Sequence, residues 1–125
     1  MNEVTTTQGK IDLARARAGE IPIPKITYIA LGTGGHEPGD PTKPVPPSPD
    51  QLALENEILR KPVSIERTGN VNRYWIELGK DEANGQVITE EGLIDENGTL
   101  VAVKTFGGKT KEIDTTLVFD WYENF

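Results

Sequence analysis

The chain has 125 residues and a formal net charge of −7 at pH 7. Its length predicts a single domain over residues 1–125 that needs no disulfide or metal ion to fold. The lack of cysteine excludes disulfide frameworks, thiol nucleophiles and cysteine-type zinc sites. The acidic charge disfavours nucleic-acid binding, and no apolar run approaches the length of a membrane span. We therefore expect a cytoplasmic product with no nucleic-acid or membrane partner.

The first quarter of the chain predicts one helix and one strand. Residues 5–20 suit a short helix, because Thr6 or Thr7 can cap its N-terminus and basic residues lie toward its C-terminal end. Two prolines follow it. Residues 25–31 (KITYIAL) then predict a central strand, because both of its faces are largely apolar. We expect the helix to lie on a sheet through a narrow apolar stripe formed by Ile11, Ala14 and Ala18.

A long loop is predicted for residues 32–49, of which residues 37–49 are the proline-rich part. Such loops in small domains are commonly functional or disordered. The loop starts Gly-Thr-Gly-Gly, as a phosphate-binding loop might, but the G-x-G-x-x-G pattern fails at Glu37 and no helix is expected to follow directly. A flexible turn is therefore favoured over a nucleotide site. Two P-x-x-P spacings leave docking onto an aromatic groove as a weaker alternative to simple stiffening of the loop.

A second, shorter helix is predicted from Ser48 to Arg60. Ser48 and Gln51 have the spacing of a capping box, in which each side chain accepts a backbone hydrogen bond at the helix start. Pro49 suits the first turn, and Pro62 lies just beyond the expected end.

The second half of the chain predicts an antiparallel meander. Strands are expected at residues 63–67, 72–78 and 112–122, with clean alternation of apolar and other side chains in the middle one. Between residues 86 and 106, two apolar runs flank Asn97-Gly98, which indicates a hairpin with a type I′ turn. Together the elements predict an α+β domain: an antiparallel sheet of five or six strands with an N-terminal helix and a second short helix.

No catalytic, cofactor or metal site is predicted. His36 is the only histidine, and without converging partners an exposed loop residue is favoured over a base or ligand. The D-x-N-G run at residues 95–98 lacks the glycine and glutamate that a calcium loop needs at its sixth and twelfth positions. Glu90 and Glu91 are adjacent on a strand and should point to opposite faces, which we interpret as a solvated rim rather than a catalytic pair.

Aromatic residues late in the chain offer a candidate interface. If Trp75 faces away from Tyr74 and Ile76, it exposes an apolar patch of the kind found where proteins meet. Equally, a second sheet face or the N-terminal helix could cover Trp75 and leave no exposed patch. The candidate interface residues are Trp75, Trp121 and Tyr122.

Three segments occur in an order that resembles a known family. They are KITYIALGTGG from Lys25, QLALENEILRKPVSI from Gln51, and GLIDENGTLVAVKTF from Gly92. Together they are similar to the N-terminal domain of phage tail-collar fibre proteins, and the last segment is the most specific. Its hairpin motif is formed by Gly92, Leu93, Ile94, Asp95, Glu96, Gly98, Leu100, Val101, Ala102 and Val103.

The resemblance implies a non-catalytic structural protein of the virion tail, made in the host bacterial cytoplasm. Family domains join tail fibres to a baseplate, so the expected partners are baseplate or tail-fibre proteins, and fibres commonly form homotrimers. Family members generally continue into a fibre shaft, whereas this sequence ends at Phe125. We therefore expect either an attachment module or a truncated prophage remnant. The alternative function is a small carbohydrate-binding or enzymatic module that uses the loop from Gly32 to Pro49.

Overall fold

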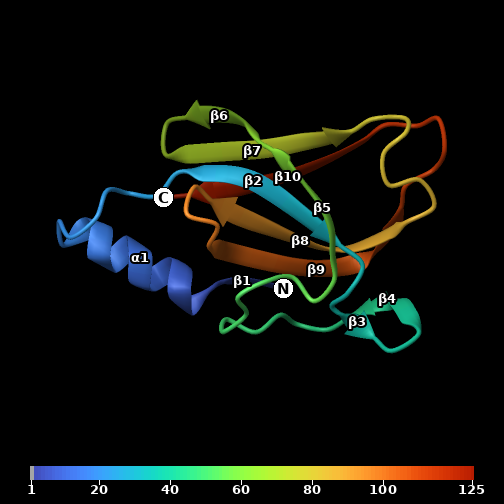
Figure 1. The fold of residues 1–125 in the computed structure, drawn as a ribbon, viewed down its shortest axis with the longest axis horizontal. Helices are drawn as coiled ribbons and strands as arrows, with labels where there is room; N and C mark the ends of the chain where they lie inside the picture. Colours follow the sequence, from blue (N-terminus) through green and yellow to red (C-terminus); the bar gives the residue numbers. More distant parts are fainter. Residues whose placement is uncertain (1) are drawn as a thin grey trace.

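Strands dominate the computed structural model, which describes residues 2–125. Strands account for 52% of the structure and helix for 9%. The predicted α+β class with two helices is therefore wrong, and the fold is mainly β (Figure 1). The described elements are β1 (Glu3–Thr5), α1 (Thr7–Arg17), β2 (Ile26–Gly32), β3 (His36–Glu37), β4 (Asp40–Pro44), β5 (Glu57–Pro62), β6 (Ser64–Thr68), β7 (Val71–Leu78), β8 (Val87–Asp95), β9 (Leu100–Thr110) and β10 (Leu117–Asn124).

Two antiparallel sheets face each other and form a sandwich. One sheet has the strand order β1-β9-β8-β2-β5 and the other the order β10-β7-β6, while β3 and β4 pair as a separate ribbon. The main core lies between the two larger sheets and takes side chains from both of them. In Figure 1 the three-stranded sheet lies above the five-stranded one. The core side chains include Ile29, Leu31, Tyr74, Ile76, Leu78, Ile88, Leu93, Phe119 and Trp121.

The strand β2 is central, as its sequence predicts. It pairs with β5 on one side and with β8 on the other. Ile29 and Leu31 enter the core of the sandwich, while Ala30 joins a second cluster on the opposite face of the sheet under Leu54. The three strands predicted at residues 63–67, 72–78 and 112–122 correspond to β6, β7 and β10, although β10 begins only at Leu117.

The second helix predicted from Ser48 to Arg60 is absent, and its residues form a turn and then β5. The capping contacts do form: Gln51 Oε1 accepts from the Ser48 amide at 2.9 Å. The helix does not continue, because Leu54 is buried against the sheet and the next amides bind a carboxylate from β8. Tertiary contacts therefore override the local preference.

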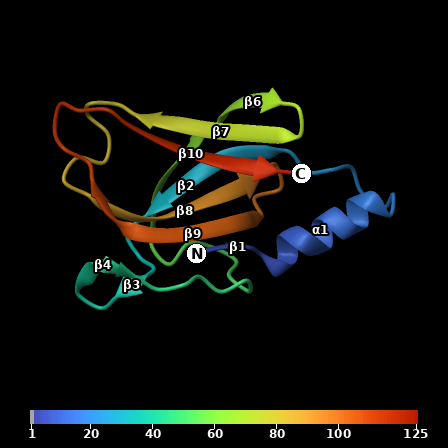
Figure 2. The ribbon, with the colours of Figure 1, turned by 180° about the vertical axis from the view of Figure 1, so that it is seen from behind.

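The helix α1 begins as predicted but does not lie on a sheet. Thr6 caps it by accepting from the Gly9 amide at 3.0 Å and donates to Leu100 O at 2.6 Å, which anchors the helix start to β9. The helix ends at Arg17 with Ala18 as its C-cap, and the next residue, Gly19, has a φ of 81° that allows the chain to turn away. In Figures 1 and 2, α1 projects beyond the end of the sandwich. The predicted apolar stripe of Ile11, Ala14 and Ala18 is exposed rather than packed.

The hairpin of β8 and β9 is confirmed, but its turn is not of type I′. The Gly98 amide donates to Asp95 O at 3.0 Å, and Gly98 has a φ of 81° while Asn97 stays at negative φ. This is the alternative three-residue hairpin loop, a type I turn followed by a left-handed glycine. Asp95 selects it, because its Oδ1 accepts from the amides of Asn97 and Thr99 at 2.9 and 3.0 Å.

The long loop predicted over residues 32–49 is partly regular. Its middle folds into the β3–β4 ribbon, and its end is held against the main sheet. The Thr105 hydroxyl donates to Val45 O at 2.8 Å, and the Val45 amide donates to Gly35 O at 2.8 Å.

The left-handed glycine of the hairpin turn should matter for stability. We expect Gly98→Ala to lower the free energy of unfolding by about 1–2 kcal/mol, because a Cβ disfavours positive φ. Urea unfolding followed by tryptophan fluorescence measures it. Gly107→Ala is the matched control: Gly107 is not at positive φ, and an added Cβ there would meet only one atom, at 3.8 Å. Equal effects of the two substitutions would contradict the argument.

Candidate functional site

The glycine loop surrounds a carboxylate of the chain itself. Glu90, on β8, is fully buried, and its Oε1 accepts from the Glu55 amide at 2.8 Å. Its Oε2 accepts from the amides of Gly34 and Asn56, both at 2.8 Å. A Cβ at Gly32 would lie 2.4 Å from that oxygen and one at Gly34 2.9 Å from it. The glycines therefore admit Glu90, and the amides that would cradle a phosphate in such a loop are already bound to it.

His36 is held within its own loop. Its Nε2 lies 2.9 Å from Thr33 O and its Nδ1 2.7 Å from Glu37 O, so both ring nitrogens contact backbone carbonyls. Across residues 2–125, no three side chains of His, Cys, Asp or Glu converge as a metal site would require.

Most residues of the hairpin motif are packed in the two hydrophobic clusters or form the turn. Leu93 and Ala102 pair across β8 and β9 and enter the main core. Leu100 belongs to the second cluster, and Gly92 lies so close to it that a Cβ would be 2.6 Å from Leu100 Cδ1. Asp95 and Gly98 form the turn. The motif therefore determines the shape of the hairpin and does not place a catalytic group.

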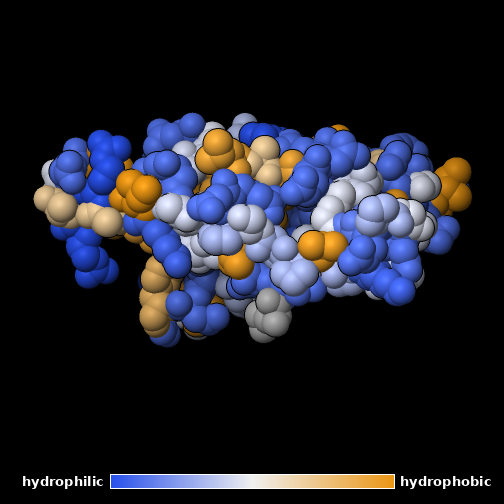
Figure 3. Space-filling view, turned by 90° about the horizontal axis from the view of Figure 1, so that it is seen from below, coloured by the Kyte–Doolittle hydropathy of each residue, from blue (hydrophilic) through white to orange (hydrophobic). Residues whose placement is uncertain are grey.

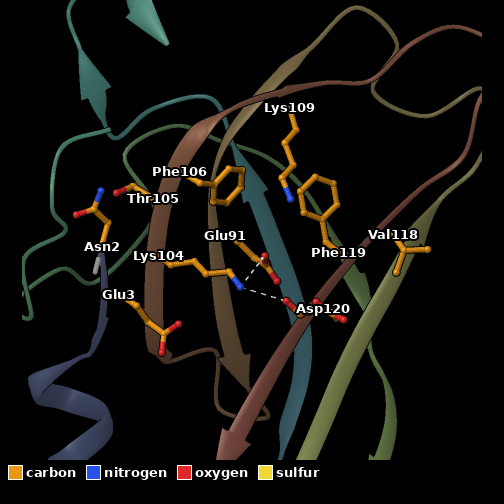
Figure 4. Close-up of a pocket in the computed structure, with 10 residues that line it drawn as sticks. All are labelled: Asn2, Glu3, Glu91, Lys104, Thr105, Phe106, Lys109, Val118, Phe119 and Asp120. Atoms are coloured by element: carbon orange, nitrogen blue, oxygen red, sulfur yellow. Dashed lines mark hydrogen bonds and ion pairs between the residues drawn. The ribbon is translucent and has the colours of Figure 1, made fainter. Parts of the chain in front are cut away.

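Glu91 lies on the opposite face of β8 from Glu90, as strand alternation predicts, but neither carboxylate is part of a solvated rim. Glu91 points between the two sheets and is almost fully buried (Figure 4). Its Oε1 is 3.5 Å from Lys104 Nζ, and its Oε2 is shielded from solvent without a hydrogen-bond partner. Lys104 also lies 4.5 Å from the centre of the Trp121 ring and donates to Asp120 O at 3.2 Å.

Burial raises the pKa of Glu91 to about 7, against the opposing pull of Lys104. A carboxyl with such a pKa is what a general acid needs. Here it adjoins a cavity of about 240 Å³, in which Lys104 and Lys109 are the nearby cations. Glu3 and Asp120 also line this cavity, but the ion pair of Asp120 is with Arg73.

The predicted interface residues separate onto two faces. Trp75 and Tyr122 lie on the outer face of the three-stranded sheet, where Asp120 pairs with Trp75 and Tyr122 with Arg73. The Arg73 guanidinium stacks 4.6 Å from the Trp75 ring, and its Nε is 3.2 Å from Asp120 Oδ2. Tyr122 is 54% exposed. Trp121, at 3% exposed, lies in the core on the other face.

A large apolar groove lies at the open end of the sandwich, and the sequence did not reveal it. This α1 groove has a volume of about 710 Å³ and is bounded by α1, by the inner face of β6 and β7, and by the two chain segments that hold Ile23 and Phe125. Figure 3 shows hydrophobic side chains on an otherwise mostly hydrophilic surface, several of them at the end from which α1 projects. The apolar stripe predicted for the helix does not line this groove, which takes Gly9, Asp12, Leu13 and Arg17 from α1 instead.

The loop from Gly32 to Pro49 borders only a small cavity. Its volume is about 200 Å³, below the usual size of small-molecule sites, and Glu90 at its wall is already bound by three amides.

No helix of residues 2–125 combines the length and apolar character needed to cross a membrane.

These features define the class of protein: a β-sandwich in which buried acids serve the fold. Its exposed groove and exposed aromatic residues are of the kind that contact other proteins. A family model described as phage tail-collar fibre protein, N-terminal, matches residues 1–117. The chain belongs to this family and is a structural component of a phage tail. A search of curated proteins finds no match.

The carboxylate of Glu90 should be essential to the loop. We expect Glu90→Gln to lower the free energy of unfolding by roughly 2–4 kcal/mol, because the amide offers one acceptor where three N–H groups need partners and its NH₂ faces donors. Chemical unfolding measures the loss, and hydrogen exchange at Gly34, Glu55 and Asn56 should accelerate. The exposed Glu66→Gln on β6 is the control and should be close to neutral; equal losses would refute the role of the cage.

The raised pKa of Glu91 should make stability depend on pH. The folded state binds the proton more tightly than the unfolded state, whose carboxyl titrates near 4.5. The stabilisation is thus complete below about pH 4.5 and is lost as the pH rises through 7, by roughly 3 kcal/mol.

Unfolding free energies measured across this range for wild type and Glu91→Gln test the assignment. The difference between the two proteins should change with pH, with Glu91→Gln gaining relative stability above pH 7. Glu77→Gln, on the exposed face of β7, controls for general charge effects. A difference that stays constant with pH would show that Glu91 titrates normally.

Proposed function

We propose that this domain is a non-catalytic attachment module that joins a tail fibre to the baseplate of the phage tail. The observation that carries the proposal is the family match over residues 1–117. The structure supports the proposal because its candidate catalytic side chains are bound to the backbone. Glu90 and Asp95 accept from backbone amides, and both ring nitrogens of His36 contact backbone carbonyls. Such groups are committed to the fold rather than placed for turnover.

The proposed partners are baseplate proteins and other tail-fibre proteins, and copies of the chain form a homotrimer. The domain is made in the bacterial cytoplasm of the host and is incorporated into the virion tail. The carbohydrate-binding or enzymatic alternative has less support, because the cavity beside the Gly32–Pro49 loop is small and its carboxylate is already bound.

The outer face of the three-stranded sheet is the proposed contact with the baseplate. Trp75 stacked under Arg73, beside the exposed Tyr122, combines the residue types that dominate binding energy at interfaces. Truncating these side chains leaves the inner, core-facing half of β7 and β10 unchanged.

We expect the double substitution Trp75→Ala and Tyr122→Ala to weaken binding to the baseplate protein by at least about tenfold. Titration of the purified baseplate proteins of the same phage, by calorimetry or interferometry, measures the affinity. Leu52→Ala is the control, since Leu52 is an apolar side chain that is 79% exposed but lies on the loop before β5. Failure of the wild-type chain to bind any baseplate or fibre protein would overturn the proposed function.

A further inference from the structure

Lys111 is a buried lysine that has no ion-pair partner among residues 2–125. It is 0% exposed and is the largest of the fully buried side chains. Its Nζ donates to Asn84 Oδ1 at 2.8 Å and to Glu112 O at 3.1 Å, and both of these acceptors are uncharged. A buried ammonium without an opposite charge is costly. Desolvation also favours the uncharged amine of a lysine, which is a nucleophile.

The side-chain amide of Asn84 is held against this amine. Because Asn84 Cγ is bonded to Oδ1 at about 1.2 Å, Lys111 Nζ lies within about 4 Å of that carbon. Asn84 Nδ2 donates to Lys80 O at 2.9 Å, which holds the other end of the amide. The backbones are paired as well: the Gly85 amide donates to Lys111 O and the Lys111 amide to Gln86 O, both at 2.9 Å. The amine and the amide are therefore kept close to the distance from which they can react.

The backbone immediately before Asn84 is strained. Ala83 has a φ of 54°, in the left-handed region that a residue with a Cβ rarely adopts. Its side chain packs against the main core, which holds the residue in this conformation and sets the direction in which the chain enters Asn84. Strain of this kind persists only where the surrounding structure imposes it, and it is commonly found at sites that carry function.

We propose that the amine of Lys111 and the side-chain amide of Asn84 react to form an isopeptide bond within the chain. The bond between Lys111 Nζ and Asn84 Cγ forms, and the bond between Cγ and Nδ2 breaks. The proton that Nζ loses leaves with Nδ2, so one amine and one primary amide give a secondary amide and one molecule of ammonia. Asn84 is exposed, so the ammonia can pass directly into solvent.

Glu82, two residues before Asn84, is the acid that accepts the proton from the lysine. Its Oε1 accepts from Lys61 Nζ at 2.6 Å and from the Gly79 amide at 2.8 Å. These two hydrogen bonds, and to a smaller extent the charges of Lys61 and Lys111, hold the pKa of Glu82 below its usual range. An ionised carboxylate is therefore close enough to Lys111 for their charges to interact. The reaction occurs once in each molecule, so a weak base is sufficient.

The bond connects the two places where the chain crosses between the sheets. Asn84 lies between β7 and β8, and Lys111 lies between β9 and β10, so each connection runs from one sheet of the sandwich to the other. Both connections lie at the end of the sandwich away from α1 (Figures 1 and 2). A crosslink between residues 27 positions apart restricts the unfolded chain and so stabilises the fold. The inference goes beyond the proposed function, because it holds whatever protein the domain binds.

The intact mass of the folded and then denatured protein tests the bond. Wild type should weigh one ammonia less than its sequence requires. Asn84→Asp, which loses water instead, should reach the same final mass. Asn84→Ala, at an exposed position, and Lys111→Arg should both keep the full masses of their sequences. A wild-type protein with the full mass of its sequence would overturn the inference.

Ammonia is also lost when an Asn-Gly pair cyclises, and Asn84 precedes Gly85. Trypsin digestion and tandem mass spectrometry separate the two products. With the isopeptide bond, the peptides that hold Asn84 and Lys111 should be found as one linked species, and trypsin should not cleave after Lys111. Asn97→Ala removes the other Asn-Gly pair and is the matched control, which should still lose ammonia. A loss of ammonia that persists in Lys111→Arg, or that disappears in Asn97→Ala, would overturn the inference.

Discussion

The carboxylate of Glu90 is the contact on which two loops beside the main sheet depend. It leaves the middle of β8 and binds amides from two segments, one at Gly34 and one at Glu55 and Asn56. A buried carboxylate is tolerable only when its oxygens are satisfied, and charge-assisted bonds to backbone amides are among the strongest available. One side chain thus fixes the glycine loop after β2 and the approach to β5, the two connections that set the edge of the main sheet.

Glu91, the next residue, is also buried, but its carboxyl group is not fully hydrogen-bonded. Its neighbour Lys104 is the nearest cation, but that ammonium also contacts Trp121 and Asp120, and Glu91 Oε2 has no partner. Desolvation therefore outweighs attraction and raises the pKa of Glu91 toward neutrality. Adjacent residues of one type differ because strand alternation sends one to a ring of amides and the other between two sheets.

Sequence reasoning recovered the elements whose patterns are local. The alternation in β7, the two apolar faces of β2, the cap at Thr6 and the β8–β9 hairpin follow from periodicity and turn residues alone. Prediction from the sequence failed where contacts with residues distant in the chain determine the local structure. The capping box at Ser48 was real, but the amides that would have continued the helix bind Glu90 instead. Likewise, the role of the glycines near Gly34 depends on a carboxylate more than fifty residues away in sequence.

The exposed stripe of α1 is the feature on which the sequence and the structure disagree most. An apolar stripe at helical spacing predicts that this face of the helix is buried, because an exposed apolar stripe is unfavourable for an isolated molecule. The structure leaves the stripe of α1 uncovered while the sandwich beside it stays open at Ile65. The chain thus satisfies the buried carboxylates of Glu90 and Asp95 with backbone amides, while the helix stripe stays exposed within residues 2–125.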